Sequence, residues 1–209
     1  MRLLIAGATG LVGRQVLELA LADARVGAVI AVTRRPVAAR PKLRNVVVDF
    51  AALPEEADWW AVDGVVASLG TTRAATPSPA EYRAIDHDYP LAVARLAHAH
   101  GATRLALTSS LGADPRSRFA YTRLKGELER DLAAIGYPSL TIVRPSVLGG
   151  ARREQRTAER VSQRLFAAIG PVVPSRWRLS PADAVAAALL EGAIAGAPGV
   201  HVLHNEDLP

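Results

Sequence analysis

The sequence predicts an α/β fold built on one doubly wound, mostly parallel sheet with helices on both faces and a small C-terminal extension. Short β-rich runs alternate with helical stretches along the 209 residues, which is typical of parallel βα units. Half of the residues are hydrophobic and 22% are charged, the composition of an ordinary globular domain. A glycine-rich turn joins the first strand to the first helix. We therefore expect a single domain over residues 1–209, with residues 151–209 contributing a small region on the substrate side.

The first half of the chain supplies four expected strands and two helical regions. Leu11–Ala22 is expected to be a helix because its apolar residues recur on one face. Ala80–His100 is also expected to be helical, and Pro90 marks a break or a new start in it, because proline lacks the N–H that a helix interior needs. The expected strands are Arg2–Ala6, Val26–Thr33, Asn45–Asp49 and Val62–Leu69.

The second half continues the alternation. Its expected strands are Arg104–Ser109, Leu140–Arg144 and a terminal strand around Val200–Leu203. Its expected helices are Phe119–Ile135, Glu154–Ala168 and Pro181–Ala195. Right-handed crossovers between these elements produce an open doubly wound sheet.

The composition excludes several classes of function. No cysteine is present, which rules out disulfides, thiolate metal sites and a cysteine nucleophile. No apolar run reaches the ~20 residues of a membrane span and the N-terminus lacks an uninterrupted signal-peptide core, so we expect a cytoplasmic protein without a membrane partner. The net charge of +5 comes from arginines spread along the chain with few aromatic residues between them, so we expect no nucleic-acid partner. The five histidines follow no metal-ligand spacing, and no metal site is expected.

The turn between the first strand and the first helix has the pattern G-x-x-G-x-x-G. Glycines permit a tight turn and let backbone N–H groups approach a pyrophosphate at the helix N-terminus. The position of the pattern, directly after a strand and at the start of a helix, makes it indicative of dinucleotide binding. The residues expected to hold the cofactor here are Gly7, Ala8, Thr9, Gly10, Leu11, Val12 and Gly13.

Two arginines, Arg34 and Arg35, follow the second expected strand, where sites that prefer NAD usually carry a carboxylate. Guanidinium groups present paired donors to phosphate, so the sequence predicts NADP(H) in preference to NAD(H). Asp49, at the end of the third strand, could accept a hydrogen bond from adenine or cap the strand. The end of the fourth strand falls at the sheet edge where ligands of such folds bind, and its expected cofactor contacts are Ser68, Leu69, Gly70, Thr71 and Thr72.

Tyr121 and Lys125 lie four residues apart, on one face of an expected helix. A nearby ammonium stabilises a phenolate, so this pair suits proton transfer to or from a substrate oxygen. Ser109 and Ser110 end the fifth strand shortly before it. Both tyrosine and lysine are also expected to contact the cofactor.

These features resemble the short-chain dehydrogenase/reductase superfamily of Rossmann proteins, and most closely its atypical group around the Tat-interacting tumour-suppressor oxidoreductase. The resemblance covers most of residues 1–156. It includes the glycine turn, Arg34-Arg35 and the runs Ser68–Arg73, Asp86–Tyr89, Thr108–Asp114, Tyr121–Glu127 and Arg144–Arg156.

By that resemblance Tyr121 is the acid/base, Lys125 is its partner and a ribose ligand, and Ser109 orients the substrate carbonyl, with Ser110 as the alternative. Leu148 and Arg156 look like further cofactor contacts. The Leu11-Val12 pair departs from the group, which has polar residues there, so side-chain contacts to phosphate fall mainly to Thr9.

We expect an NADP(H)-dependent oxidoreductase that transfers hydride to or from a small carbonyl or hydroxyl compound. Two alternatives fit the same residues: a non-catalytic NADP(H)-binding sensor or regulatory protein, and an enzyme similar to nucleotide-sugar epimerases and dehydratases. Exposed helices such as Tyr121–Ile135 could pair two subunits as a homodimer, although nothing in the sequence requires it.

Overall fold

The computed structural model describes residues 1–72, 75–149 and 179–209, and it confirms the predicted fold class. All strand pairs of the seven-stranded main sheet are parallel, in the order β3-β2-β1-β4-β5-β6-β9. The chain runs outward from β1 to β3 and returns on the other side of β1, so the strand order reverses between β1 and β4. The strands are β1 (Arg2–Ala6), β2 (Ala28–Thr33), β3 (Leu43–Val47), β4 (Gly64–Ala67), β5 (Arg104–Thr108), β6 (Ser139–Arg144) and β9 (Gly199–His204).

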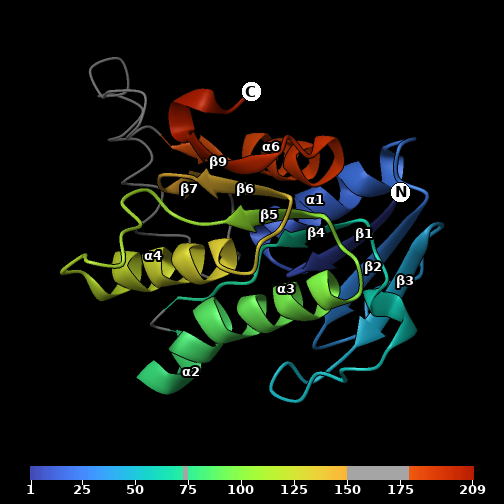
Figure 1. The fold of residues 1–209 in the computed structure, drawn as a ribbon, viewed down its shortest axis with the longest axis horizontal. Coiled ribbons are helices and arrows are strands. Elements are labelled where there is room, and N and C mark those ends of the chain that lie inside the picture. Colours follow the sequence, from blue (N-terminus) through green and yellow to red (C-terminus); the bar gives the residue numbers. More distant parts are fainter. Residues whose placement is uncertain (73–74, 150–178) are drawn as a thin grey trace.

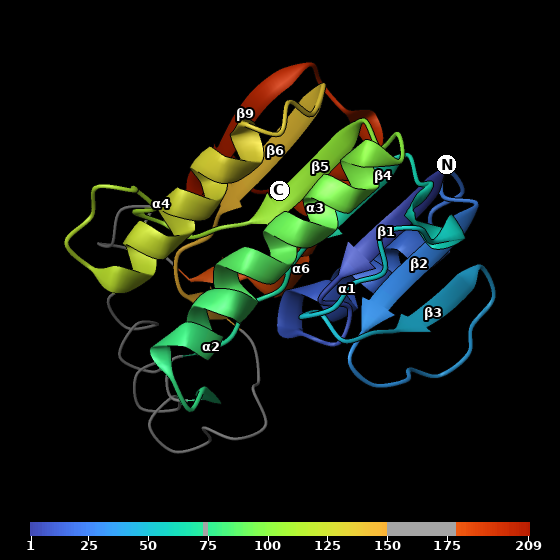
Figure 2. The same ribbon diagram turned by 60° about the horizontal axis from the view of Figure 1, so that its bottom comes forward.

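Helices cover both faces of the sheet (Figures 1 and 2). One face carries α1 (Leu11–Ala22) and α6 (Ala182–Ala195), which pack against each other. The other face carries α3 (Tyr89–Ala99), α4 (Ala120–Ala133) and the short α2 (Pro79–Arg83). The remaining short elements are η1 (Asp58–Trp60), η3 (Ala84–Asp88), η5 (Asn205–Asp207) and the pair β7 (Leu148–Gly149) and β8 (Ser180–Pro181).

The core lies in two layers because alternate residues of each strand point to opposite faces. Leu4 of β1 packs with α3 and α4 residues such as Val93 and Leu128. Leu3 and Ile5 pack on the other side with α1 and α6. Leu3, Leu4 and Ile5 are fully buried, and burying each of these side chains contributes about 1.5–3 kcal/mol to stability.

Most predicted elements are present. The bounds of β1 and α1 are as predicted, whereas β3 begins and ends two residues earlier than the predicted Asn45–Asp49. The described C-terminal residues form the predicted helix and strand: α6 packs on α1, and β9 extends the main sheet beside β6. The predicted helix Glu154–Ala168 lies outside the described residues.

The predicted break at Pro90 takes the form of a π-helical turn. Pro90 lies in the first turn of α3, and because it has no N–H it cannot continue the hydrogen-bond ladder from the helical turn before it. The five residues before α3 form η3, which continues from α2. Asp86 and His87 of this wider turn are buried and contact α4. Such turns occur frequently at functional sites.

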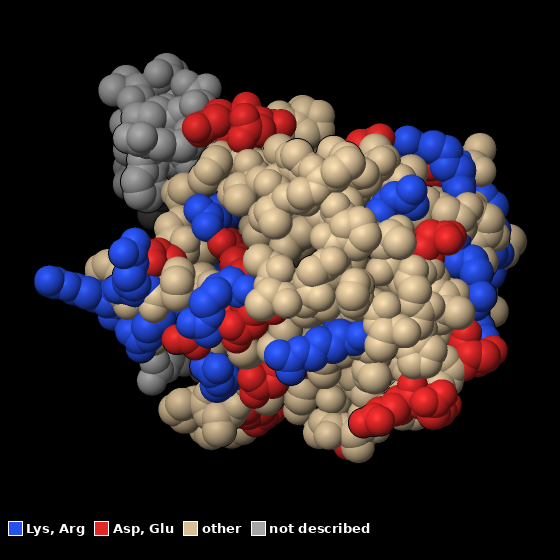
Figure 3. Space-filling model, viewed as in Figure 1, with Lys and Arg blue, Asp and Glu red and all other residues tan. Residues whose placement is uncertain are grey.

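The surface in Figure 3 carries basic and acidic side chains interspersed beside a broad uncharged area. Among the described helices, none is long and apolar enough to cross a membrane. In the same part of the chain, no three His, Asp or Glu side chains gather into a group that could hold a metal ion.

Candidate functional site

A cleft of about 250 Å³ opens at the carboxyl ends of the central strands, beside the point where the strand order reverses. Ligands of open α/β sheets bind at this place. The cleft is lined by Gly7, Thr9, Gly10, Val32, Thr33, Arg34, Phe50, Ser68, Leu69, Gly70, Ile85 and Tyr89.

The glycine turn forms one wall of the cleft, and two of its glycines are required by close packing. Gly7 has φ +99°, and a β-carbon there would lie 2.4 Å from the carbonyl oxygen of Ser68. A β-carbon on Gly13 would lie 2.0 Å from the carbonyl oxygen of Gly7. Glycine at these positions therefore lets β1, α1 and the end of β4 meet without side chains between them.

The N-terminus of α1 fits the pyrophosphate of a dinucleotide. Gly10 caps the helix without a side-chain hydrogen bond, and the first turn contains no acidic residue. The first N–H groups of a helix have no acceptor within it, and the helix dipole favours an anion there. Of the predicted contacts in this turn, Thr9 lines the cleft, while Ala8, Leu11 and Val12 pack into the core and leave only backbone groups for a ligand.

Arg34 lines the cleft and is exposed, and Arg35 beside it is also exposed. Neither guanidinium takes part in any of the ion pairs between described residues. Asp49 lies beyond the end of β3 and outside the cleft lining, and its Oδ1 accepts a hydrogen bond from the N–H of Ala51 at 2.9 Å. Asp49 thus caps the turn that follows the strand.

The end of β4 forms the opposite wall of the cleft. Ser68, Leu69 and Gly70 line it, whereas Thr71 and Thr72 lie just beyond the lining. The hydroxyl of Thr108, at the end of β5, donates a hydrogen bond to Ser68 Oγ at 3.1 Å. Thr71 donates its backbone N–H to Asp86 Oδ2 at 2.8 Å, so this wall is tied to η3.

Lys125 reaches the cleft wall from α4. Its ammonium nitrogen lies 3.0 Å from Asp86 Oδ1, and both side chains are buried. A β-carbon placed on Gly70 would lie 3.9 Å from the same nitrogen. Tyr121, one turn earlier on α4, is 45% exposed. The structure therefore brings Lys125 to the glycine that lines the cleft and leaves the phenol before it accessible.

The two neighbouring serines differ in what they contact. The buried Ser109 hydroxyl donates a hydrogen bond to Glu129, whose carboxylate is also paired with Arg144 and raises the pKa of that guanidinium. Ser110 is less buried, and its hydroxyl bonds only to the carbonyl of Leu111 at 3.3 Å among the described residues. Ser109 is thus engaged in a buried network, which the spacing of the serines could not reveal.

Several lining residues were not predicted. Phe50 and Tyr89 stack with ring centroids 5.8 Å apart and provide an aromatic surface in the cleft. Val32 and Ile85 add aliphatic side chains to the same lining. Asp86 appeared in the sequence analysis only as part of the run Asp86–Tyr89 that resembles the family, with no role of its own. Its position shortly before Pro90, in an expected helix, was the feature that could have indicated an irregular helical turn there. Leu148 is partly buried and packs against the core near α1 and α6, and Arg156 lies outside the described residues.

Comparison with known families supports cofactor binding. A family model described as NAD(P)H-binding matches residues 7–191. A protein of Emericella nidulans named Protein fmp52, mitochondrial, is 33% identical over 174 residues, which are 79% of this chain and 75% of that protein. Protein FMP52, mitochondrial, of Debaryomyces hansenii is 36% identical over 155 residues, 73% of this chain and 69% of the relative. The expectation of a cytoplasmic protein is wrong, because relatives that match most of the chain are named as mitochondrial.

Solved structures share the fold. MoeE5 in complex with UDP-glucuronic acid and NAD superposes with a TM-score of 0.74 at 21% identity, over 97% of this chain and 75% of that one. A short-chain dehydrogenase family protein from Francisella tularensis has a TM-score of 0.64 at 15% identity, over 99% and 98% of the two chains. At these identities the likeness establishes the fold alone.

Proposed function

The chain belongs to the NAD(P)H-binding family, and from this premise we propose that it is an NADP(H)-dependent oxidoreductase of the atypical short-chain dehydrogenase/reductase type. Its substrate is a small carbonyl or hydroxyl compound. The observation that carries the proposal is the approach of the Lys125 ammonium to Gly70, because it joins the cofactor cleft to the helix that bears Tyr121.

Different residues around the cleft would bind different parts of the cofactor. The backbone of the Gly7–Gly13 turn would hold the pyrophosphate, and the aromatic surface of Phe50 and Tyr89 would accept the adenine end. Arg34 at the rim would pair with a 2′-phosphate, with Arg35 beside it. No carboxylate stands at the end of β2 to bond the ribose 2′-hydroxyl of NAD. These features support a preference for NADP(H).

Side chains of the protein would transfer the proton that the carbonyl oxygen needs. A bound reduced nicotinamide cofactor would supply the hydride for the carbonyl carbon. Tyr121 gives its phenolic proton to the carbonyl oxygen, which completes the alcohol, and later regains a proton from solvent. Lys125 stabilises the phenolate, and Asp86 holds the ammonium in place. Ser110 would orient the carbonyl oxygen, because Ser109 already donates its proton to Glu129.

One observation favours a second function, that of an NADP(H)-binding sensor without turnover. Lys125 and Ser109 both have buried carboxylate partners within the fold, as structural residues would. The exposed Tyr121, one helical turn before Lys125 and outside the cleft lining itself, favours the enzyme instead, because a sensor does not need an accessible acid on this helix.

A substrate screen separates the two functions. NADPH oxidation is followed by absorbance with a panel of aldehydes, ketones and quinones, using the wild-type chain and Tyr121→Phe. The enzyme predicts reduction of at least one panel member, a fall in rate of about 10²-fold or more in Tyr121→Phe, and unchanged NADPH affinity. NADPH binding by both chains with no turnover of the panel would favour the sensor.

A further inference from the structure

We propose that Asn45 is a positioning residue that sets the cofactor preference by holding the arginine segment at the rim of the cleft. The proposal rests on the NADP(H) preference proposed above and identifies how the fold maintains it. Asn45 lies on β3, opposite Ala31 of the neighbouring strand β2, and its side chain is partly buried.

The Asn45 side chain makes three hydrogen bonds to the end of β2 and the residues after it. Its Nδ2 donates to the carbonyl of Ala31 and to Thr33 Oγ1, each at 2.8 Å. Its Oδ1 accepts the backbone N–H of Val37 at 2.9 Å. The amide therefore bridges both sides of the arginine pair, two residues before Arg35 and two residues after it.

Thr33 passes this restraint on to the arginines. Its hydroxyl accepts from Asn45 and donates to the carbonyl of Arg35 at 2.7 Å. Chains of hydrogen bonds in which one hydroxyl both accepts and donates reinforce each other. Thr33 is 4% exposed and lines the cleft, so the turn that presents Arg34 is fixed to a buried side chain.

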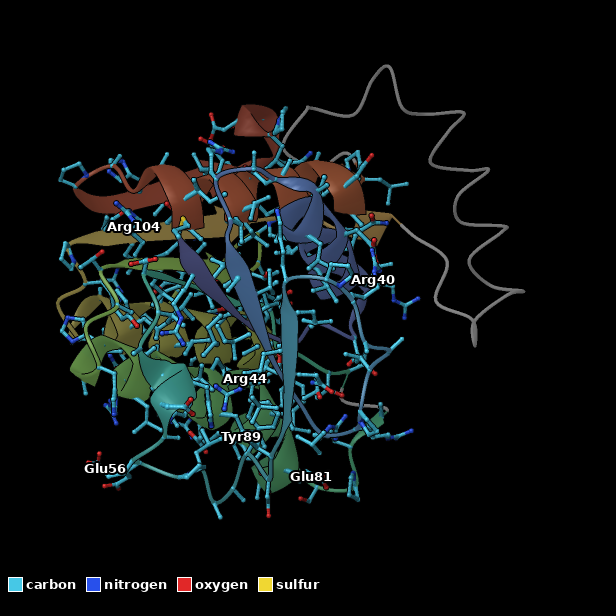
Figure 4. The ribbon with its side chains drawn as sticks, turned by 90° about the vertical axis from the view of Figure 1, so that its right-hand side faces the viewer. Arg40, Arg44, Glu56, Glu81, Tyr89 and Arg104 are labelled. Atoms are coloured by element: carbon cyan, nitrogen blue, oxygen red, sulfur yellow. The ribbon has the colours of Figure 1, made fainter. Side chains whose placement is uncertain are left out.

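The backbone between the two anchors has little freedom left. Pro36 stands between Arg35 and Val37, and its ring restricts φ there. The far end of the same loop is tied to α1, because Arg40 donates two hydrogen bonds to the Glu18 carboxylate at 2.9 and 3.1 Å. Figure 4 shows Arg40 beside α1, on the opposite side of β3 from Arg44.

This arrangement positions two guanidinium groups, those of Arg34 and Arg35, that have no charged partner among the described residues. Arg34 and Arg35 form no ion pair with any described residue, so only the backbone and its hydrogen bonds restrain where their side chains start. A segment whose backbone is already ordered loses less conformational entropy when it binds a phosphate. Asn45 therefore favours NADPH over NADH without touching the cofactor.

The test compares the dissociation constants of NADPH and NADH for the full-length chain and its variants by titration calorimetry. The two ligands differ only in the 2′-phosphate, so a general loss of stability weakens both alike. Asn45→Ala and the near-isosteric Thr33→Val are each expected to weaken NADPH about fivefold more than NADH, as the loss of about 1 kcal/mol of positioning implies. Thr33→Ser keeps the hydroxyl and should restore the wild-type ratio.

Arg44→Ala is the matched control. Arg44 is the strand neighbour of Asn45 and pairs with Asp58 at 2.7 and 2.9 Å, away from the arginine segment, so its loss should leave the ratio unchanged. A wild-type ratio in both Asn45→Ala and Thr33→Val would overturn the proposal for Asn45 while the NADP(H) preference stood. Equal affinities of the wild-type chain for the two cofactors would overturn the preference itself, and the role of Asn45 with it.

Discussion

The ammonium of Lys125 and the carboxylate of Asp86 form a buried ion pair with Nζ and Oδ1 3.0 Å apart, at the wall of the cofactor cleft. The second oxygen of Asp86 accepts the N–H of Thr71, so one carboxylate connects α4 to the end of β4. The pair thus fixes the position of the lysine relative to Gly70, which lines the cleft.

Removing one partner of this pair should destabilise the fold strongly. Asp86→Ala leaves a buried ammonium without a counter-charge and is expected to lower the free energy of unfolding by about 3–5 kcal/mol. The double variant Asp86→Ala/Lys125→Met should lose less than the sum of the two single changes, because it leaves no unpaired charge. Urea unfolding of the four chains measures this coupling, and strictly additive losses would contradict it.

Gly7→Ala should abolish cofactor binding and destabilise the protein. The new β-carbon would meet the backbone of Ser68, which cannot move without shifting β4. Gly101 has nearly the same φ, +96° against +99°, but open space around it. Gly101→Ala therefore reports the backbone strain alone, about 1–2 kcal/mol, and should leave NADPH binding intact. Thermal unfolding and titration calorimetry on both variants separate the clash from the strain, and equal behaviour of the two would contradict the packing role of Gly7.

Substitutions of the two serines at the end of β5 should have different effects on kcat and on stability. Ser110→Ala is expected to lower kcat by about 10–10²-fold with little effect on stability, because it removes a donor to the substrate oxygen. Ser109→Ala should lower stability by about 1–3 kcal/mol, because the buried Glu129 loses a hydrogen-bond donor, and should affect kcat less. A larger kcat loss in Ser109→Ala than in Ser110→Ala would return the orienting role to Ser109.

Tyr137 links the core to stability at high pH. Its hydroxyl donates to the carbonyl of Ala94 at 2.7 Å, and burial raises the pKa of the phenol above its usual value of 10.0. The folded chain keeps the proton longer than the unfolded chain, so this contribution is present below pH ~10 and is lost as the pH rises further. Tyr137→Phe should lose about 1 kcal/mol at neutral pH and show a shallower decline above pH ~10. Parallel declines of the two chains in urea unfolding would contradict this.

Local patterns in the sequence were sufficient for the sheet and for the glycine turn. The bounds of β1 and α1 follow from an apolar run, a glycine turn and an amphipathic helix, all of which are short-range signals. The β3 bounds were two residues off because its edge position leaves most of its residues only partly buried, which weakens the apolar signal.

Several predicted residues line the cleft, among them Gly7, Arg34 and Gly70, but the sequence did not reveal the side-chain partners of the other predicted residues. Asp86 and Lys125 are separated in the sequence by the whole of α3 and β5, and Asp86 meets α4 from the π-helical turn η3. Ser109 and Ser110 are neighbours, so their distances along the sequence to Tyr121 differ by only one residue and cannot distinguish them. The fold distinguishes them, because the Ser109 hydroxyl reaches the Glu129 carboxylate. The hydrogen bonds of Asn45 depend on the register of β3 against β2, which the residue pattern of one sequence does not determine.

A crystal structure of the chain with NADPH and a substrate carbonyl compound tests most directly whether the cleft presents a cofactor to Tyr121. We expect the 2′-phosphate within hydrogen-bond distance of Arg34, the pyrophosphate on the Gly7–Gly13 turn, and the nicotinamide ribose within reach of Lys125. The substrate oxygen should lie about 3 Å from the Tyr121 hydroxyl, with the reacting carbon against the nicotinamide ring. A nicotinamide that lies away from Tyr121, or a 2′-phosphate that no arginine contacts, would contradict the proposed function.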